Sequence, residues 1–496
     1  MPADRIERSA SAPGDTPLVI AERIKSSLRV HALNDRAAAL GLKPGLPLAD
    51  ARAMYPGIEV RDADRAADRA LLEAVADWCD RYTPLVGLDP PDGLLLDISG
   101  CAHLFGGERA LGRDMLARLS RQGFHALLGL ADTAGCAWAV ARYGKLHLVT
   151  QGGMRGALLP LPLAALRIDD DTIAALAQAG LKRIADVIDR PRAPLTARFG
   201  QAFLQRLDQA LGREDESIKP RLPLPAYMAE RRFPDPIGRE DDVLGTIERL
   251  AHELGQVMER RGEGARLLQA ALFRTDGKVH RIRAAASEPL IDPGRIRRLF
   301  VERLAVAGDE CDPGFGYDMV RLSALTAGRL KEEQIGLSGG SHDAGLAYLI
   351  DRLNARFGAR RLTRPLPRDS HIPELAVAAV PAQAAKQDTP AHIFAQDSLA
   401  PVRPVRLFAR PEAIEVINEV PDGPPIRFRW RHVLHSVQAA EGPERIAFAW
   451  WEKPPGRAHA RDYFRVESKE GARVWIYREG DYRRRQACWF VHGLFA

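Results

Sequence analysis

Apolar residues recur three or four positions apart between Arg65 and Tyr82, which is the clearest hydrophobic period in the first part of the chain. This spacing predicts an amphipathic helix. The turn-rich segment Asp-Pro-Pro-Asp-Gly at 89–93 follows, and then the apolar run Leu94–Leu96 ends at Asp97. Turn residues ahead of a short apolar run predict a strand with carboxylates at its ends. The same reasoning predicts helices at Glu108–Gln122 and Ala134–Tyr143, and a strand at Ala126–Ala131.

Later segments differ in their pattern. Residues 161–214 have a helical pattern throughout, and residues 226–330 combine two long helices with strands joined at an Asp276-Gly277 turn. Short strands rich in Trp, Phe, Tyr and Arg are expected in 402–496. Proline-rich stretches at 220–225 and 381–401 indicate linkers. These patterns predict a multidomain α+β protein.

Composition narrows the class of protein. A chain of 496 residues with 46% hydrophobic residues is expected to form several globular domains. No apolar run approaches the roughly 20 residues that span a bilayer, and the N-terminus lacks an apolar signal core, so a cytoplasmic protein without membrane contact is expected. The five cysteines are scattered without a C-x-x-C pair, and the histidines are isolated. Neither a metal site nor a disulfide framework is therefore expected.

The C-terminal 70 residues carry the net charge of +6, with 14 Lys and Arg against 8 Asp and Glu. They also hold five of the seven tryptophans. A basic, aromatic-rich segment is typical of a nucleic-acid or partner surface. A small β domain with aromatic core residues and solvated arginines fits equally well.

Several motifs resemble one family. The block from Tyr82-Thr-Pro-Leu-Val through Leu94-Leu-Leu-Asp-Ile-Ser-Gly to Leu104-Phe-Gly resembles the palm hairpin of Y-family translesion DNA polymerases, and Gly45–Ala51 resembles their fingers. The C-terminal blocks at 461–467, 475–480 and 489–495 resemble ImuB-type homologues. The resemblance implies a right-hand fold with a C-terminal extension of short β-strands. Its implied parts are a truncated palm remnant (1–15), fingers (16–62), palm (63–160), a helical thumb (161–219), little finger (226–330), a linker with a helix (331–401) and a basic aromatic-rich region (402–496).

The catalytic motif of that family is altered here. Active members carry Ser-Ile-Asp-Glu where this chain reads Pro90-Pro91-Asp92-Gly93, so Asp92 is a remnant and the Glu is lost at Gly93. The family's other metal acid lies on an N-terminal strand, and Asp4 follows no such strand. Two divalent ions need several carboxylates to offset their repulsion. We therefore expect no intact catalytic site, and Mg²⁺ only if the chain is active after all.

The triphosphate contacts of active members are also missing. Their Tyr and Arg fall on Asp35 and Ala38, and their phosphate-binding Lys falls on Trp138. A carboxylate repels a triphosphate, and loss of an Arg removes a charge-assisted hydrogen bond. Asp97, which ends the apolar strand, is expected to be structural.

DNA contact is expected in two places. The thumb resembles a helix-hairpin-helix, but its turn at 167–172 contains three acids, which favours a structural hairpin with weak DNA contact. Basic residues on two adjacent little-finger strands are better candidates for the DNA backbone, with a solvated strand face as the alternative. These residues are Arg274, Lys278, Arg281 and Arg283.

A short segment after the little finger resembles a sliding-clamp-binding peptide. It consists of Gln334, Ile335, Gly336, Leu337 and Ser338. The Gln amide would bind at the rim of the clamp pocket while the apolar residues fill two subsites. Ser338 replaces the usual aromatic residue, so modest affinity is expected. Gln396–Leu399 is a weaker second candidate.

The motifs and the family resemblance together predict a non-catalytic adaptor in damage-induced mutagenesis. By resemblance, its partners are primer-template DNA, the β sliding clamp, an error-prone C-family polymerase subunit and a RecA-like ImuA-type accessory protein. The alternatives are an active low-fidelity translesion polymerase, using Asp92, Asp97 and an upstream acid, and a DNA-binding repair factor without clamp contact.

Overall fold

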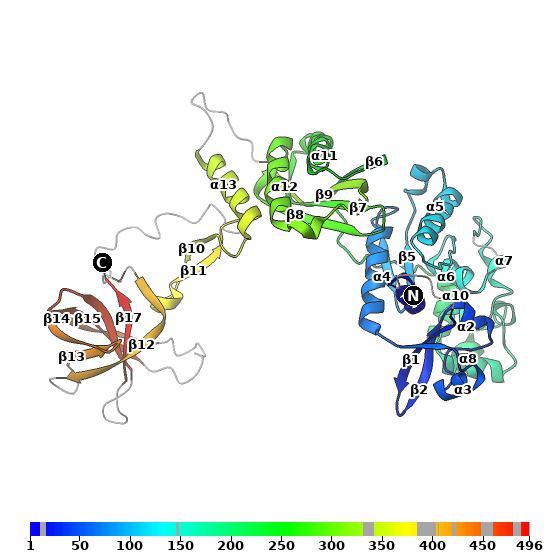
Figure 1. Ribbon diagram of the computed structural model, residues 1–496, viewed down its shortest axis with the longest axis horizontal. Coiled ribbons are helices and arrows are strands. Elements are labelled where there is room, and N and C mark those ends of the chain that lie inside the picture. Colours follow the sequence, from blue (N-terminus) through cyan, green and yellow to red (C-terminus); the bar gives the residue numbers. More distant parts are fainter. Residues whose placement is uncertain are drawn as a thin grey trace. The chain divides into compact units, whose positions relative to one another are not determined.

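The computed structural model describes residues 1–9, 16–144, 148–330, 342–383, 403–404, 406–418, 423–447, 460–479 and 488–495. The chain forms two compact units, Met1–Gly340 and Ser341–Ala496 (Figure 1). Both contain helices and strands, so the predicted α+β class is confirmed. Both candidate clamp-binding segments, Gln334–Ser338 and Gln396–Leu399, lie outside the described residues. No helix in the described ranges has the length and apolarity needed to cross a membrane.

The first unit begins with helix α1 (Pro2–Ser9), in the segment interpreted as a palm remnant. Asp4 of this helix is buried and accepts a hydrogen bond from the backbone N–H of His125. A small sheet follows, in which β1 (Leu18–Ile24) pairs antiparallel with β2 (Ser27–Leu33) and parallel with β3 (Glu59–Asp62). Helices α2 (Asp35–Ala39) and α3 (Leu48–Met54) contribute Ala37, Leu48 and Ala51 to its apolar core.

The predicted amphipathic helix is α4 (Arg65–Cys79), and the hairpin of β4 (Val86–Asp89) and β5 (Gly93–Leu96) follows it. Helices α5 (Glu108–Arg121) and α6 (Ala134–Tyr143) also match the prediction. The strand predicted at Ala126–Ala131 is wrong, because only Leu130 forms a β-bridge, to Leu148. Its apolar residues do not share one buried face, since Leu127 is 70% exposed.

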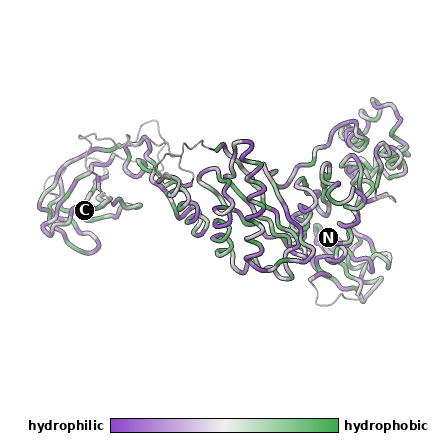
Figure 2. Tube along the Cα trace, turned by 90° about the horizontal axis from the view of Figure 1, so that it is seen from above, coloured by the Kyte–Doolittle hydropathy of each residue, from purple (hydrophilic) through white to green (hydrophobic). Residues whose placement is uncertain are grey.

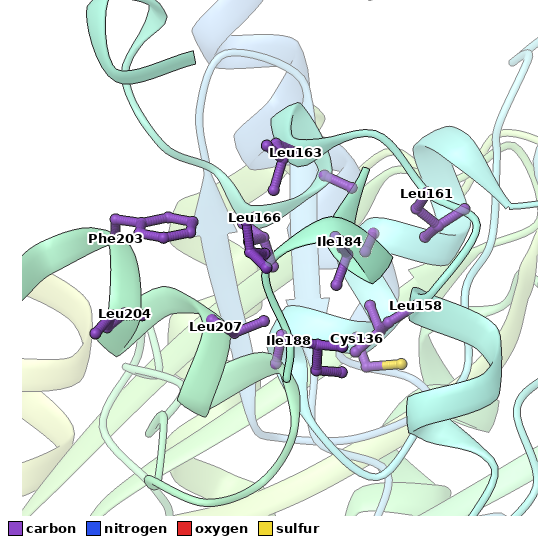
Figure 3. Packing of buried hydrophobic residues seen from close by; sticks show 14 of the residues in the cluster. Cys136, Leu158, Leu161, Leu163, Leu166, Ile184, Ile188, Phe203, Leu204 and Leu207 are labelled. Atoms are coloured by element: carbon purple, nitrogen blue, oxygen red, sulfur yellow. The ribbon is translucent and has the colours of Figure 1, made fainter. Parts of the chain in front are cut away.

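The helical pattern predicted from Leu161 to Glu214 is confirmed as far as Ala210, and residues 211–214 form turns instead. This segment contains α8 (Asp170–Gln178), α9 (Arg192–Phe199), α10 (Gln201–Ala210) and short 3₁₀ turns, and α7 (Met154–Leu158) lies ahead of it. Leu158, Leu166, Ile184, Phe203 and Leu207 converge in their core (Figure 3). Cys136 of α6 belongs to the same cluster, so this core attaches α6 to the helical segment.

A four-stranded antiparallel sheet completes the first unit, in the order β6 (Tyr227–Ile237), β9 (Tyr317–Arg329), β7 (Glu263–Arg274), β8 (Val279–Leu290). Helices α11 (Glu240–Arg260) and α12 (Pro293–Ala307) cover one face (Figure 1). The side chains of Leu268, Leu272 and Ile282 are buried. Figure 2 shows hydrophobic and hydrophilic positions interspersed along the trace. The Asp276-Gly277 turn joins β7 to β8 as predicted.

The second unit contains α13 (His342–Phe357) and a hairpin of β10 (Thr363–Pro367) and β11 (Val377–Pro381). The hairpin was missed in a segment interpreted as a linker with one helix. Six strands then close into a barrel. They are β12 (Arg406–Asn418), β13 (Pro425–Trp430), β14 (Val433–Ile446), β15 (Arg461–Ser468), β16 (Arg473–Glu479) and β17 (Cys488–Leu494).

Candidate functional site

The β4–β5 hairpin carries two carboxylates beside its turn. Asp89 ends β4 and pairs in register with Gly93, and Asp92 lies in the turn between them. A Cβ atom at Gly93 would lie 2.8 Å from Oδ2 of Asp89 and 2.9 Å from its backbone oxygen. A Glu side chain therefore cannot be added at position 93 without displacing Asp89.

Both carboxylates are bound by side chains of α6. Trp138 and Arg142 lie four residues apart and share one face of this helix. The Nε1–H of Trp138 donates to Oδ2 of Asp89 over 2.7 Å, and the Arg142 guanidinium forms a 2.5 Å ion pair with Asp92. The hydrogen bond to Asp92 also raises the pKa of Arg142. The helix is fixed by its Thr133 N-cap and by the burial of its opposite face.

Arg167 contributes from the predicted helix-hairpin-helix turn. It has a positive φ of 56° and forms a 2.5 Å ion pair with Glu216. Its guanidinium lies 5.8 Å from the ring centroid of Trp138, and that of Arg142 lies 4.7 Å from the same ring. We call Asp89, Asp92, Trp138, Arg142 and Arg167 the remnant cluster.

Asp169, one of the three acids of the same turn, has a structural role. Asp169 caps α8 by accepting the backbone N–H of Thr172 over 2.8 Å, and hydrogen bonds from Thr172 lower the pKa of Asp169. Such a cap stabilises a helix N-terminus. These contacts support the interpretation of the turn as a structural hairpin.

The remnant cluster does not fit a pair of divalent ions. Such a site needs several free carboxylate oxygens around each ion, whereas Arg142 neutralises Asp92 and Trp138 binds Asp89. In the part of the chain that is described, no three His, Cys, Asp or Glu residues are placed to hold a metal. Asp97 accepts the backbone N–H of Ser99 over 2.9 Å and so stabilises a turn.

Asp35 and Ala38, the positions of the lost triphosphate contacts, are both exposed on α2. Asp35 lies in the first turn of this five-residue helix. The structure therefore places a carboxylate where the resemblance implies an uncharged phenol. The phosphate-binding role that it implies for position 138 is replaced by a neutral indole bound to Asp89.

Arg281, one of the predicted DNA contacts, lies in a different network. Its guanidinium pairs with Asp77 over 2.5 Å and with Asp80, both at the end of α4. Arg221 contacts the same two carboxylates over 2.5 and 2.9 Å, and Arg321 donates to the backbone oxygen of Asp80 over 2.6 Å. We call these five residues the palm–sheet network. Burial raises the pKa of Asp80, although Arg221 and Arg281 oppose this shift.

The other three DNA candidates have unequal access to solvent. Arg274 pairs with Asp276 over 2.5 Å and donates to the backbone oxygen of Asp312. Lys278 and Arg283 are exposed, and Arg283 donates to Gln269 over 2.9 Å. The geometry therefore favours Lys278 and Arg283 as contacts for a DNA backbone over Arg274 and Arg281.

The C-terminal aromatic residues are mainly core residues in the described part of the barrel. Trp475 and Trp489 are buried in two separate clusters. Several arginines pair with carboxylates, including Arg431 with Glu412 and Arg465 with Glu441. These contacts favour the interpretation as a β domain with solvated ion pairs over that of a basic nucleic-acid surface.

Among known proteins, this chain has high sequence identity to one relative and lower identity to several others. Residues 9–142 match the model of the impB/mucB/samB family. Protein ImuB of Caulobacter vibrioides, in strain NA1000 / CB15N and again in strain ATCC 19089 / CIP 103742 / CB 15, is 41% identical over 471 residues, covering 92% of this chain and 100% of the relative. DNA polymerase IV of Shewanella amazonensis is 23% identical over 317 residues, which cover 62% of this chain and 86% of the relative.

Two solved structures are also similar. DinB from Sulfolobus solfataricus has 15% identity and a TM-score of 0.37, over 64% of this chain and 93% of its own. An insertion ternary complex of Dbh DNA polymerase has 16% identity and a TM-score of 0.38, and the match covers 64% of this chain and 93% of the polymerase chain. The identity to ImuB spans the whole relative and agrees with the impB/mucB/samB match in the first 142 residues. The chain therefore belongs to the ImuB family of Y-family polymerase-like proteins.

Proposed function

We propose that this protein is a non-catalytic, polymerase-shaped adaptor in damage-induced mutagenesis by translesion DNA synthesis. The observation that carries the proposal is the remnant cluster, in which Trp138 and Arg142 bind the two hairpin carboxylates. Nucleotidyl transfer uses two divalent ions to stabilise the attacking and leaving oxygens. Metal binding at Asp92 would first have to break its ion pair with Arg142.

DNA contact is assigned to the sheet of the first unit. Lys278 and Arg283 are exposed on β8 and the turn before it, where a phosphate can reach them. Each phosphate contact adds about one to the slope of log affinity against log salt concentration. We expect the double variant Lys278→Ala/Arg283→Ala to bind primer-template DNA more weakly, with a slope reduced by about two. An unchanged slope would remove this assignment.

Recruitment completes the proposed function. The segment Gln334–Ser338 would bind the β sliding clamp, and the C-terminal region would recruit an error-prone C-family polymerase subunit and a RecA-like ImuA-type protein. Membership of the ImuB family supports these partners. The adaptor needs no metal or cofactor of its own, and it would act in the cytoplasm.

Primer extension by the purified chain tests the absence of catalysis. The assay compares the chain with its Asp92→Ala variant, in Mg²⁺ and in Mn²⁺, beside an active DNA polymerase IV. We expect no extension by either form under conditions in which the control extends the primer. Extension by the chain that disappears in Asp92→Ala would establish the second candidate, an active low-fidelity polymerase. That candidate is supported by the retention of Asp92, whose side chain is 40% exposed.

Clamp pull-down separates the adaptor from a DNA-binding repair factor without clamp contact. We expect Gln334→Ala/Leu337→Ala to lose the clamp, because the Gln amide and one apolar anchor are removed together. Glu332→Ala/Glu333→Ala changes two adjacent residues outside the motif and serves as the matched control. Clamp binding that survives the first pair would disprove the motif assignment.

A further inference from the structure

The barrel of the second unit carries apolar clusters on both sides of its wall. The inner cluster includes Phe464, Ile476 and Trp489, as a closed barrel requires. Tyr463 and Trp475 alternate with these inner residues along β15 and β16, so they lie on the outer side. Aromatic rings on the outside of a barrel are not needed to fill it.

The outer rings form a preorganised surface. Tyr463 stacks on Trp475 with ring centroids 4.1 Å apart, and His492 lies parallel to Trp475 at 5.7 Å. The Tyr463 hydroxyl lies 2.8 Å from Nδ1 of His492 and accepts a hydrogen bond from Arg461 over 3.3 Å. Burial lowers the pKa of His492, so its ring is neutral near pH 7. We call Arg461, Tyr463, Trp475, Tyr477 and His492 the outer aromatic face.

A loop of the same unit occupies this surface. The β10–β11 hairpin pairs with no other strand among the described residues, and its loop spans 368–376. Ile372 of this loop is 2% exposed and packs against Tyr463, Trp475 and Tyr477. We call residues 370–375 the hairpin tip.

Two polar contacts flank the apolar anchor. Glu374 accepts a hydrogen bond from Arg461 over 2.6 Å, and Nε2 of His371 lies 2.6 Å from the backbone oxygen of Ala447. The hairpin tip therefore binds as a short peptide motif does. It uses one buried branched residue, one acid bound by an Arg and one contact to a backbone oxygen. Because the tip is covalently joined to the barrel, a contact this small is favoured by an effective concentration in the mM range.

We propose that the outer aromatic face is a docking surface for a peptide of a protein partner, and that the hairpin tip occupies it in the partner's absence. The partner peptide would carry a branched apolar residue followed, two positions later, by an acid. The apolar residue would replace Ile372, and the acid would take the place of Glu374 on Arg461. This inference rests on the proposed recruitment through the C-terminal region and assigns it a surface and a ligand chemistry.

Binding of a labelled peptide tests the proposal. The probe is a synthetic peptide of residues 366–378, and its fluorescence anisotropy is measured with the full-length chain. In Ile372→Asp/Glu374→Arg the tip is removed from the face, and we expect this variant to bind the peptide at least about tenfold more tightly than the unaltered chain. Equal affinity for the two chains would overturn the proposal. Ile372→Ala, a milder change, replaces the double variant if that variant does not fold.

A charge swap tests the geometry. Adding Arg461→Glu to the freed chain should abolish binding, and a peptide with Glu374→Arg should restore it. Arg429→Glu, an equivalent reversal at an exposed site on β13, should leave binding unchanged. Binding unaffected by Arg461→Glu, or not restored by the swapped peptide, would overturn the proposal. If the peptide fails to bind while the C-terminal region still pulls down the error-prone polymerase, this inference is wrong and the proposed function stands.

Discussion

Two regions of the first unit use the same chemical groups for different ends. Both contain two nearby aspartates bound by side chains from distant segments: in the palm–sheet network arginines pair with both aspartates, whereas in the remnant cluster Arg142 pairs with Asp92 and the neutral Trp138 indole binds Asp89. The side chains of Asp92 and Arg142 are 40% and 32% exposed, whereas those of Asp80 and Arg281 are 11% and 16% exposed. The ion pairs of the remnant cluster and of the palm–sheet network therefore differ in burial rather than in the types of residue that form them.

The physical consequence is a difference in energy. An exposed ion pair is screened by water and salt and contributes about 0–1 kcal/mol. Removing one partner from a buried pair leaves an uncompensated charge and costs about 3–5 kcal/mol. The palm–sheet network therefore stabilises the contact between α4 and the sheet, and the remnant cluster mainly neutralises its carboxylates.

The largest expected effect is that of Arg281→Ala. It leaves Arg221 as the network cation that pairs with the carboxylates of Asp77 and Asp80, since Arg321 contacts only the backbone oxygen of Asp80, and we expect the free energy of unfolding to fall by about 3 kcal/mol. Chemical denaturation of the full-length chain, followed by tryptophan fluorescence, measures this change. Arg283→Ala on the same strand is the control and should change the value by no more than about 0.5 kcal/mol. Equal effects of the two variants would contradict the comparison.

Gly93→Glu, which adds back the carboxylate of active relatives, should have the second-largest effect on the free energy of unfolding. Its Cβ would overlap Asp89, so we expect a loss of about 2 kcal/mol and no primer extension. Gly57→Glu is the matched control, because a Cβ there meets no atom within 4 Å. A stable Gly93→Glu variant with polymerase activity would show that the remnant cluster can still hold metal.

Asp80→Asn should cost less than Arg281→Ala, about 1 kcal/mol near pH 7, because the charge-assisted hydrogen bonds from Arg221 and Arg281 are weakened while the cost of burying the charge is relieved. Burial raises the pKa of folded Asp80 above that of the unfolded chain, so the folded protein holds this proton more tightly. The ionised carboxylate therefore favours unfolding, and this cost disappears as the pH falls through the folded pKa.

Thermal unfolding of the chain and of Asp80→Asn between pH 7 and pH 4 tests that sign. The difference between their Tm values should shift in favour of the unaltered chain as the pH falls, since the other carboxylates are common to both. If the Tm difference shifted in favour of the variant instead, the arginines Arg221 and Arg281 would lower the pKa of Asp80 by more than burial raises it.

Arg142→Ala should have the smallest effect, about 0.5 kcal/mol or less, because its ion pair with Asp92 is partly exposed. Denaturant melts at low salt and in 1 M NaCl should show that even this difference vanishes when charges are screened. If the free energy of unfolding fell by more than about 2 kcal/mol at both salt concentrations, the Arg142–Asp92 pair would behave as a buried pair, like those of the palm–sheet network.

The sequence by itself determined the local elements and the charge pattern of the candidate site. Helical periods marked α4, α5, α6 and α11, because side chains three or four positions apart share one face of a helix. The turn at 89–93 marked the strand with Asp92 before it, and the family resemblance showed that an acid is lacking at position 93, but Asp89 was not singled out. Each of these inferences uses residues close together in the chain.

Only the tertiary structure decided which groups meet. Trp138 and Arg142 reach carboxylates 49 and 50 positions away, and Arg281 reaches Asp80 across 201 positions. The outer aromatic face likewise depends on the antiparallel pairing of β15 with β16 and of β16 with β17, and on the docking of the hairpin tip against them. Hydrophobic periodicity reports which face of an element is buried, but not against which element it packs. The partners of a buried charge therefore follow from the packing, and the packing here makes Arg281 a structural residue and leaves Arg283 exposed.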